Sequence, residues 1–532
     1  MTEAAQRGEP DLKTLFERSL QKYIDRTAVH FGDRTLTYGE LDRRSNAFAN
    51  ALVDRGVIPG HRTALLMVSL PEYLVARLGL IKAGAVELPI NPMLSPPEFE
   101  YMLSDAGAGT VITGPSFTET IDTELRGSLD KVENWIAITR GENPPAAFES
   151  FSCLESEGSS STSPEVDLSP DDLGGHFYTG GTTGKPKGVL HTQRGLALDN
   201  AAHLMEFEIG GDDTLLITTP LPHAGGGFLS VGLLCGADAV VHPSFDVEDV
   251  LAAIETHGVT WTFMVPTMIY ELLDSPALAE ADTSSLDTIC YGAAPMTPDR
   301  LRAGLEEFGP IFLQFYGQTE IPNLITTLGK DEHRIALDGG FEERLSSAGH
   351  PSLMVDLRIQ DVETGREVGP GEIGELLASA PYQMVGYHER PDATDETLDD
   401  GWVRTGDIAR VDEDGYVYLL DRRNDVIVSG GMNVYSTAVE EVIAEHQAVQ
   451  EVGVIGIPDD KWGEAVKAVV VTYEEASTTE QEIISFSEQQ LADYKIPKSV
   501  DFVDNLPKTP YGKIDKGDLR EPYWQGTDRE IG

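Results

Sequence analysis

Tyr178-Thr-Gly-Gly-Thr-Thr-Gly-Lys-Pro-Lys-Gly-Val189 places four glycines, three threonines and two lysines within twelve residues. Glycines let backbone N–H groups approach an anion closely, and threonine hydroxyls and lysine ammonium groups add hydrogen-bond donors and positive charge. The stretch therefore predicts a loop around a polyphosphate, entered from a strand over 176–179. It is not a Walker A loop, because Pro186 follows Lys185 where that loop needs serine or threonine.

Helical and β-rich patterns alternate along the N-terminal part of the chain. Apolar residues have helical spacing over 41–54 and 71–83, and short β-rich runs cover 62–68 and 85–90. This alternation predicts parallel sheets with helices packed on their faces.

The pattern changes at residues 421–425, where we predict a domain boundary. A small α+β unit follows, with helices expected over 437–447 and 479–492 and strands over 452–457 and 466–473. The predicted fold class is α/β, with a large N-terminal domain (1–421) of parallel-type sheets flanked by helices and a small α+β C-terminal domain (422–532).

The charge balance is strongly acidic. The chain has 89 acidic residues against 39 basic ones, a formal net charge of −50. Such a surface repels nucleic acid and anionic membranes, so no nucleic-acid partner is expected. The acidic residues are spread along the chain rather than gathered in a tail. This pattern is typical of proteins that work in concentrated salt, where screening removes self-repulsion, and it indicates a halophilic protein.

Other composition features predict a cytoplasmic protein without a membrane span. No run approaches the roughly 18 apolar residues that a spanning helix needs. The first twenty residues are charged and lack the apolar core of a signal peptide. The cysteines Cys153, Cys235 and Cys290 are widely spaced and form no CxxC pair, which indicates reduced thiols rather than disulfides or a zinc site.

A second segment suited to phosphate chemistry is Tyr316-Gly-Gln-Thr-Glu320, which follows an apolar strand over 311–315. Its glycine allows a tight turn at the strand end. Thr319 offers a hydroxyl to a phosphate, and Glu320 offers a hard oxygen to Mg²⁺. Taken alone, an aromatic-glycine turn with one acid is more often structural.

Further segments would each pass for a turn, a cap or a solvated tail if taken singly. They are Tyr291-Gly-Ala-Ala-Pro295, Gly401-Trp-Val-Arg-Thr-Gly-Asp407, Gly430-Gly-Met-Asn-Val434, Leu506-Pro-Lys-Thr-Pro-Tyr-Gly-Lys-Ile-Asp-Lys516 and Pro220-Leu-Pro-His-Ala-Gly-Gly-Gly227. Taken together and in their order along the chain, all these segments resemble the motifs of the adenylate-forming superfamily: acyl-CoA synthetases, adenylation domains and luciferases. The similarity runs from Leu36-Thr-Tyr38 to Leu519. It implies a large domain that holds ATP and the acyl group, and a small mobile domain that carries a catalytic lysine.

The resemblance implies a role for each matching residue. Lys513 would reach the α-phosphate and the substrate carboxylate, and it is expected to be catalytic together with Thr319 and Gly431, the latter beside the pantetheine tunnel. Glu320 would bind Mg²⁺ and Asn424 would be the hinge. The expected ATP-binding residues are Thr179, Gly180, Gly181, Thr182, Thr183, Gly184, Lys187, Gly292, Ala293, Ala294, Pro295, Gln314, Tyr316, Gly317, Gln318, Asp407 and Arg422.

On the acyl and CoA side the resemblance points to His223, Gly227 and Gly430. His223 is either a gate near these sites or a satisfied core histidine. Relatives that activate amino acids hold the α-ammonium with an aspartate in this region, and its absence here argues against an α-amino acid. The remaining pocket candidates are small or apolar: Gly225, Gly226, Ala293, Ala294, Phe263, Val265 and Met268.

Two departures from the family pattern concern the hinge and the CoA side rather than adenylation. Asn424 stands where aspartate or lysine is usual, and the family's YPxE segment is Tyr435-Ser-Thr-Ala438 here.

The implied function is ATP-dependent activation of a carboxylic acid to acyl-AMP, followed by transfer to CoA. The expected cofactors are ATP and Mg²⁺, with CoA as co-substrate. A medium- or long-chain fatty acid is the first choice of substrate. The alternatives are an aryl-CoA ligase, an adenylating enzyme that loads a carrier protein, and a catalytically silent binding protein. The partners are then small molecules, and the oligomeric state stays open, a homodimer included.

The acidic charge generates a prediction about salt. Repulsion between exposed charges reaches over about 30 Å at 0.01 M salt but only about 3 Å at 1 M, because dissolved ions screen it. We therefore expect the thermal unfolding midpoint to rise steadily between millimolar and molar KCl, because acidic residues repel one another less. An unchanged midpoint in such a titration would contradict the halophilic interpretation.

Overall fold

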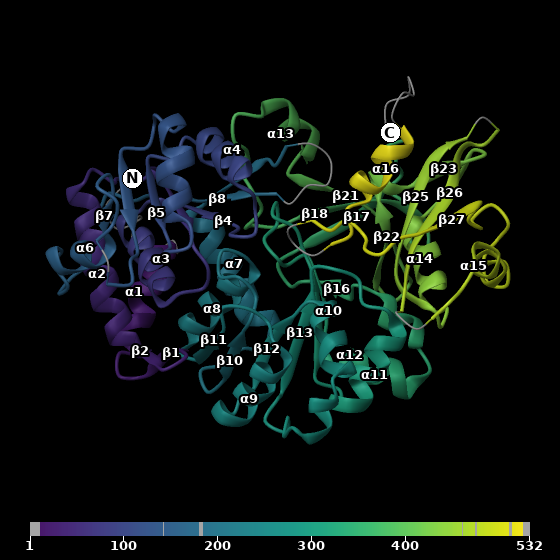
Figure 1. Cartoon of the computed structure of the whole chain (residues 1–532), viewed down its shortest axis with the longest axis horizontal. Coiled ribbons are helices and arrows are strands. Elements are labelled where there is room, and N and C mark those ends of the chain that lie inside the picture. The colour runs from purple at the N-terminus through teal and green to yellow at the C-terminus, as the bar shows by residue number, and fades with distance from the viewer. Residues whose placement is uncertain are drawn as a thin grey trace. The chain divides into compact units, whose positions relative to one another are not determined.

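The computed structural model describes residues 11–141, 143–179, 185–459, 461–473, 476–509 and 513–524. These residues form two compact units (Figure 1). The first contains residues 11–179, 186–356 and 379–403, and the second contains residues 357–378 and 404–524. The domain boundary that the sequence predicts at residues 421–425 stays a prediction.

The first unit contains a nine-stranded sheet in the order β16-β15-β14-β13-β12-β10-β11-β1-β2. Its six central strands, from β14 to β1, are parallel, and the two ends continue in antiparallel pairs. The strands are β1 (Thr27–Phe31), β2 (Arg34–Thr37), β10 (Thr214–Ile217), β11 (Asp238–Val241), β12 (Trp261–Met264), β13 (Thr288–Gly292), β14 (Phe312–Tyr316), β15 (Thr326–Leu328) and β16 (His350–Pro351).

A second sheet of the same unit has eight strands in the order β19-β9-β8-β4-β3-β5-β6-β7. Pairing is parallel from β8 to β7 and antiparallel for β8–β9 and β9–β19. The strands are β3 (Arg62–Leu66), β4 (Val86–Ile90), β5 (Thr110–Thr113), β6 (Asn134–Ala137), β7 (Glu149–Ser150), β8 (Leu173–Tyr178), β9 (Gly188–Thr192) and β19 (Gly386–Tyr387).

Helices pack on these sheets, so that α3 contacts β3 and β4, α7 contacts β8 and β9, and α8 contacts β10 and β11. The main helices are α1 (Leu12–Lys22), α2 (Tyr38–Asp54), α3 (Pro71–Ala83), α4 (Pro96–Ala106), α6 (Phe151–Glu157), α7 (Gln193–Glu206), α8 (Ala224–Cys235), α9 (Val247–His257), α10 (Pro266–Asp274), α11 (Pro298–Phe308), α12 (Lys330–Gly339) and α13 (Pro391–Thr397). The predicted α/β architecture is therefore confirmed.

A buried lysine ties α2 to α3. The Lys82 side chain is fully buried, and its ammonium donates to Asp42 Oδ1 (2.8 Å), Ser45 Oγ (2.7 Å) and Asn46 Oδ1 (2.7 Å). Burial lowers the pKa of Lys82, while the Asp42 carboxylate opposes that change. The ammonium is tolerated in the core because each of its three donors has an acceptor.

The second unit contains most of one smaller sheet and the whole of another. In the first of these, β17 (Asp356–Gln360), β18 (Ile373–Ser379) and β21 (Trp402–Val411) are neighbours, and β22 (Val417–Arg422) pairs with β21. The short strand β20 (Leu398–Asp399) pairs with Trp402 and Val403 of β21, which like β20 belong to the first unit. The other has the order β24-β23-β26-β25, with β27 beside β26, and packs with α14 and α15 around a valine- and isoleucine-rich core, while α16 packs on β25. Its elements are β23 (Ile427–Ser429), β24 (Met432–Val434), α14 (Ser436–Ala444), β25 (Val449–Asp459), β26 (Gly463–Thr472), α15 (Glu480–Ser487), β27 (Ser499–Phe502) and α16 (Lys516–Trp524).

One predicted helix is shorter than expected. Apolar spacing predicted a helix over 479–492, but α15 ends at Ser487. Its start agrees with the predicted one, and Thr479 caps it in a capping box with Glu482. After Ser487 the backbone bonds tighten, because the Gln489 and Gln490 N–H groups reach the carbonyls three residues earlier instead of four. Among the described residues, no helix combines the length and apolar character needed to cross a bilayer.

Four histidines of the first unit are buried: His176, His191, His203 and His333. Loss of hydration lowers the pKa to about 4 for His191, His203 and His333. Burial lowers the pKa of His176 to about 3, with added repulsion from His388 and Arg62. The unfolded chain therefore binds protons below pH 6.5 that the folded chain does not, so the free energy of unfolding falls as pH drops from 6.5 toward 4.

We expect the urea midpoint at constant KCl to be lower at pH 5 than at pH 7. His333 is the clearest contributor, because its Nδ1–H donates to the Gly329 carbonyl (2.8 Å) and its Nε2 accepts from the Tyr291 hydroxyl (2.9 Å), a pairing that only the neutral ring can make. His333→Gln should reduce the dependence between pH 5 and 6.5 by close to one proton, about 1.4 kcal/mol per pH unit. An identical dependence in both proteins would contradict this assignment.

Candidate functional site

The predicted phosphate loop connects two paired strands. Gly180, Gly181, Thr182, Thr183 and Gly184 lie outside the described residues, but both ends of the loop are described. The Thr179 N–H donates to the Lys187 carbonyl (3.0 Å), and the Lys187 N–H donates to Thr179 Oγ1 (3.2 Å). These bonds extend the β8–β9 ladder by one pair, so Thr179 and Lys187 hold the two ends of the loop together.

Two further predicted nucleotide segments lie at neighbouring strand ends. Gly292, Ala293, Ala294 and Pro295 end or follow β13, while Gln314, Tyr316, Gly317 and Gln318 lie on or directly after β14. The two strands are parallel neighbours, with Gly292 opposite Phe315. Their carboxyl ends therefore share one edge of the sheet, the usual place for a ligand in parallel sheets. Their proximity matches the expectation that both segments contact one nucleotide.

Close packing explains the glycines of both segments. A Cβ at Gly292 would lie 2.5 Å from the Phe315 carbonyl oxygen, and one at Gly317 would lie 2.2 Å from the Asn323 carbonyl carbon. Ala293 has a φ of 66°, a left-handed conformation that is unfavourable for alanine. The backbone at this edge is therefore held in a conformation that few sequences allow.

Thr319 and Glu320 are anchored by residues that the sequence analysis missed. The His191 Nε2–H donates to the Thr319 carbonyl (2.9 Å), and the Met384 N–H donates to the Glu320 carbonyl (2.8 Å). The Tyr387 hydroxyl donates to Glu320 Oε1 (2.5 Å). His191 lies on β9 and Tyr387 on β19, far from Glu320 in sequence, so no local pattern could have identified them.

Glu320 fits the predicted role of a magnesium ligand. Mg²⁺ in nucleotide sites is usually held by one or two carboxylates together with phosphates and water, not by a cage of protein groups. Among the described residues, no three histidine, cysteine, aspartate or glutamate side chains are grouped so as to hold a metal by themselves. A single anchored carboxylate beside the predicted phosphate-binding segments is the donor set that such an arrangement requires.

The start of α8 corrects part of the predicted acyl pocket. A Cβ at Gly225 would lie 2.5 Å from the Thr219 carbonyl oxygen, and one at Gly226 would lie 2.1 Å from the Leu221 carbonyl oxygen. These two glycines allow close backbone packing and do not line an open pocket. At Gly227 the one neighbour of a Cβ is the Asn323 amide nitrogen, 3.2 Å away. His223 is exposed at the N-cap of α8, which does not fit a core histidine.

The second unit contains the residues predicted to bind ribose and the α-phosphate. Asp407 on β21 and Arg422 on β22 are opposite each other, and Arg422 Nε lies 2.8 Å from Asp407 Oδ1. Asp407 is buried, whereas Arg422 and Lys513 are exposed. Loss of hydration, followed by repulsion from the Arg422 guanidinium, lowers the pKa of Lys513. The Asp407 carboxylate opposes this change. The lysine is thus held close to another cation, where an anionic ligand would be attracted.

Short hydrogen bonds fix the backbone around Lys513. The Thr509 N–H donates to the Lys513 carbonyl (2.7 Å), and the Lys513 N–H donates to Thr509 Oγ1 (3.3 Å). Further along, Lys516 Nζ donates to Ser436 Oγ (2.7 Å). The catalytic candidate is therefore presented from a loop that is tied at both ends within its own unit.

Gly430 and Gly431 form the β23–β24 turn with φ values of 61° and 79°. Two successive positive φ values are typical of a type I′ hairpin, which favours glycine. A Cβ at Gly430 would lie 2.8 Å from the Trp462 ring, but one at Gly431 would have no neighbour within 4 Å among the residues that the structure describes. Gly430 is thus required by packing, whereas Gly431 presents an open face of its unit.

The hinge candidate Asn424 lies in a single 3-10 turn, Arg423–Asp425. Its carbonyl accepts a hydrogen bond from Arg520 Nη1 (2.8 Å), and Arg520 also pairs with Asp425. Its side chain is exposed. The turn is therefore connected to α16 through its backbone, and the hinge role of Asn424 stays a prediction.

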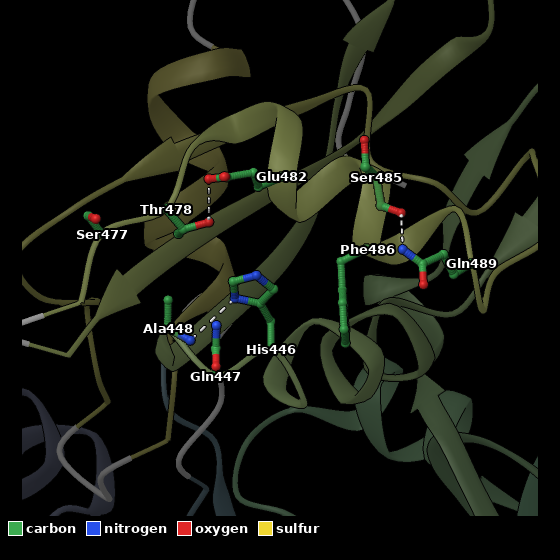
Figure 2. Close-up of a pocket in the computed structure, with 9 residues that line it drawn as sticks. All are labelled: His446, Gln447, Ala448, Ser477, Thr478, Glu482, Ser485, Phe486 and Gln489. Atoms are coloured by element: carbon green, nitrogen blue, oxygen red, sulfur yellow. Dashed lines mark hydrogen bonds between the residues drawn. The ribbon is translucent and has the colours of Figure 1, made fainter.

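A pocket of about 300 Å³ lies in the second unit, away from every predicted site residue (Figure 2). Its polar groups bond locally. His446 Nδ1 accepts from the Ala448 N–H (3.3 Å), Thr478 donates to Glu482 (3.4 Å), and Gln489 donates to the Ser485 carbonyl (3.2 Å). None of the residues that line this pocket belongs to the predicted site, and we assign it no ligand.

Comparison with known proteins agrees with this geometry. The family model of AMP-binding enzymes matches residues 16–388, and that of the AMP-binding enzyme C-terminal domain matches residues 438–513. The chain is 39% identical to a medium/long-chain-fatty-acid–CoA ligase of Mycobacterium tuberculosis, over 97% of this chain and 90% of the relative. It is 38% identical to a feruloyl-CoA synthase of an Amycolatopsis species, over 93% and 96%. Among solved structures, ATP-bound MatB from Rhodopseudomonas palustris superposes with a TM-score of 0.87 at 31% identity, covering 96% of this chain and 99% of that one.

Proposed function

The chain belongs to the AMP-binding enzyme family, and from this premise we propose that it activates a medium- or long-chain fatty acid. It is an acid–thiol ligase that forms acyl-CoA and releases AMP and pyrophosphate. The acid itself and the residues that carry each step are our proposal.

In the first step, a carboxylate oxygen of the acid attacks the α-phosphorus of ATP. The bond from that phosphorus to the bridging oxygen breaks, and the electron pair leaves with pyrophosphate. Negative charge accumulates around the α-phosphate, where the Lys513 ammonium stabilises it. Thr319 donates to a phosphate oxygen, and Asp407 accepts from the ribose hydroxyls with Arg422 beside it. Mg²⁺, when bound at Glu320, neutralises phosphate charge.

In the second step, the CoA sulfur attacks the acyl carbon after losing its proton. The bond from that carbon to the phosphate oxygen breaks, and AMP leaves. We assign the approach of the pantetheine arm to the open side of Gly431, where no described residue lies within 4 Å of an added Cβ. The small domain presents first Lys513 and then Gly431, which requires it to turn about Asn424.

The observation that carries the substrate proposal is the glycine at position 227. It faces the side chain of Asn323, three residues after the predicted magnesium ligand Glu320, and it carries no side chain of its own. The neighbouring Phe228 and Phe263 rings are buried in the core, with centroids 4.9 Å apart, so apolar side chains pack next to this position. A long apolar acid suits such surroundings. The 38% identity to a feruloyl-CoA synthase keeps an aryl acid as the second candidate.

Lys513→Ala should reduce acyl-AMP formation by several orders of magnitude, because the charge beside the α-phosphate is lost, yet spare thioester formation from supplied acyl-AMP. Pyrophosphate exchange measures the first half-reaction and acyl-CoA release the second. Lys508→Ala is the matched control, since Lys508 belongs to the same segment but pairs with Glu451. Equal loss in both half-reactions would exclude this role for Lys513.

Gly431→Leu should show the opposite bias, with acyl-AMP formed and transfer to CoA blocked by the added bulk. Because any side chain is strained at a φ of 79°, Gly431→Ala is the control that adds strain with little bulk. Transfer that is slow in the leucine variant and near normal in the alanine variant would support obstruction. Equal transfer rates in both variants would contradict it.

For the substrate, we expect the specificity constant to rise by up to about fourfold for each added methylene, the equivalent of about 0.8 kcal/mol, until the pocket ends. A series of acids from acetate to palmitate, with benzoate and ferulate alongside, tests this with ATP, Mg²⁺ and CoA in concentrated KCl. Gly227→Trp should shorten the preferred chain, whereas Gly227→Ala should not. Peak activity on acetate, or on aryl acids alone, would overturn the fatty-acid proposal.

A further inference from the structure

Tyr387 contacts two residues predicted to act on the phosphates. Its hydroxyl donates to Glu320 Oε1 (2.5 Å), and the Lys187 ammonium lies 4.2 Å from the centre of its ring. The predicted magnesium ligand and the lysine of the phosphate loop therefore share one neighbour, which contacts the first through its hydroxyl and the second through its ring. Neither the family resemblance nor any sequence pattern gave Tyr387 a role.

The backbone fixes the position of this ring. Tyr387 lies on β19, opposite Val189 on β9. The Val385 N–H donates to the Leu190 carbonyl (2.9 Å), and the His388 N–H donates to the Gly188 carbonyl (2.8 Å). Lys187 directly precedes Gly188, the first residue of β9. The pairing of β9 with β19 therefore holds the Tyr387 ring next to the Lys187 side chain.

The surroundings of the hydroxyl suit a permanent hydrogen-bond donor. Tyr387 is only 6% exposed. A tyrosine hydroxyl carries its proton near neutral pH, and here it points at Glu320 Oε1 and acts as the donor. A short bond from a neutral hydroxyl to a carboxylate is among the stronger hydrogen bonds in proteins. The hydrogen bond from Tyr387 therefore restricts the rotation of the Glu320 carboxylate.

We propose that Tyr387 is a positioning residue for the magnesium–nucleotide site, whose hydroxyl orients the Glu320 carboxylate for the cation and whose ring holds Lys187 for the phosphates. The inference rests on the proposed function, because it assumes that Glu320 binds Mg²⁺ and Lys187 binds ATP. The two contacts are separable. Tyr387→Phe removes the hydroxyl and keeps the ring, whereas Tyr387→Leu removes both.

The test measures ATP binding as a function of Mg²⁺ concentration, by the ATP-induced rise in the unfolding midpoint and by calorimetry, so it does not depend on turnover. For Tyr387→Phe we expect about tenfold more Mg²⁺ at half-maximal ATP stabilisation, the usual loss when a partner of a metal ligand is removed. ATP binding without Mg²⁺ should be unchanged. Tyr387→Leu should in addition weaken ATP binding without Mg²⁺, because Lys187 loses its support.

Tyr73→Phe is the matched control, since Tyr73 is also buried and donates to a carboxylate oxygen, Glu87 Oε1 (3.3 Å), outside the predicted site. Glu320→Gln provides a second test. If Tyr387 acts through Glu320, adding Tyr387→Phe to Glu320→Gln should change the Mg²⁺ dependence no further. A full additional shift in the double variant would overturn the proposal, as would a Mg²⁺ dependence in Tyr387→Phe equal to that of Tyr73→Phe.

The design separates this inference from the proposed function. If the unaltered protein binds ATP without any Mg²⁺ dependence, or shows no pyrophosphate exchange, the proposed function is wrong. If the unaltered protein and Glu320→Gln differ as expected but Tyr387→Phe matches the unaltered protein, only the role of Tyr387 is wrong.

Discussion

Strand β9 is paired along both of its edges, and the geometry of the first unit's site depends on this pairing. On one side its ladder with β8 holds the two ends of the phosphate loop together through Thr179 and Lys187. On the other side β19 adds to it and brings Tyr387 to Glu320 and Lys187. His191, on the same strand, holds the Thr319 carbonyl. One short strand thus connects segments that are some two hundred residues apart in sequence.

The acidic charge of the protein makes the position of each basic residue in the predicted site important. With 39 basic against 89 acidic residues, the surface as a whole repels ATP and CoA, which are polyanions. Binding therefore requires local positive charge that nearby carboxylates do not fully neutralise. In the second unit, Arg422 pairs with Asp407, yet its charge still acts on Lys513. Loss of hydration, followed by repulsion from the Arg422 guanidinium, lowers the pKa of Lys513.

Several elements were predictable from local patterns. The helix predicted over 71–83 has the bounds of α3, and the helix predicted from 479 begins within one residue of α15. The end of α15 was not predictable, because apolar residues continue with helical spacing beyond Ser487 while the backbone turns. The role of Gly225 and Gly226 was misjudged for a related reason. A glycine that avoids a clash and a glycine that opens a pocket are identical in sequence, and only the positions of the Thr219 and Leu221 carbonyls separate them.

The sequence by itself determined the family, the α/β fold class and the identity of the motif residues, because each motif is a local run whose residue types follow from the chemistry of phosphate, ribose and thioester. Only the tertiary structure decided how these residues are supported. His191 and Tyr387 act on Thr319 and Glu320 through strand pairings between distant segments. Such contacts leave no periodicity or spacing in the chain, since a strand's partner is chosen by the packing of the whole sheet.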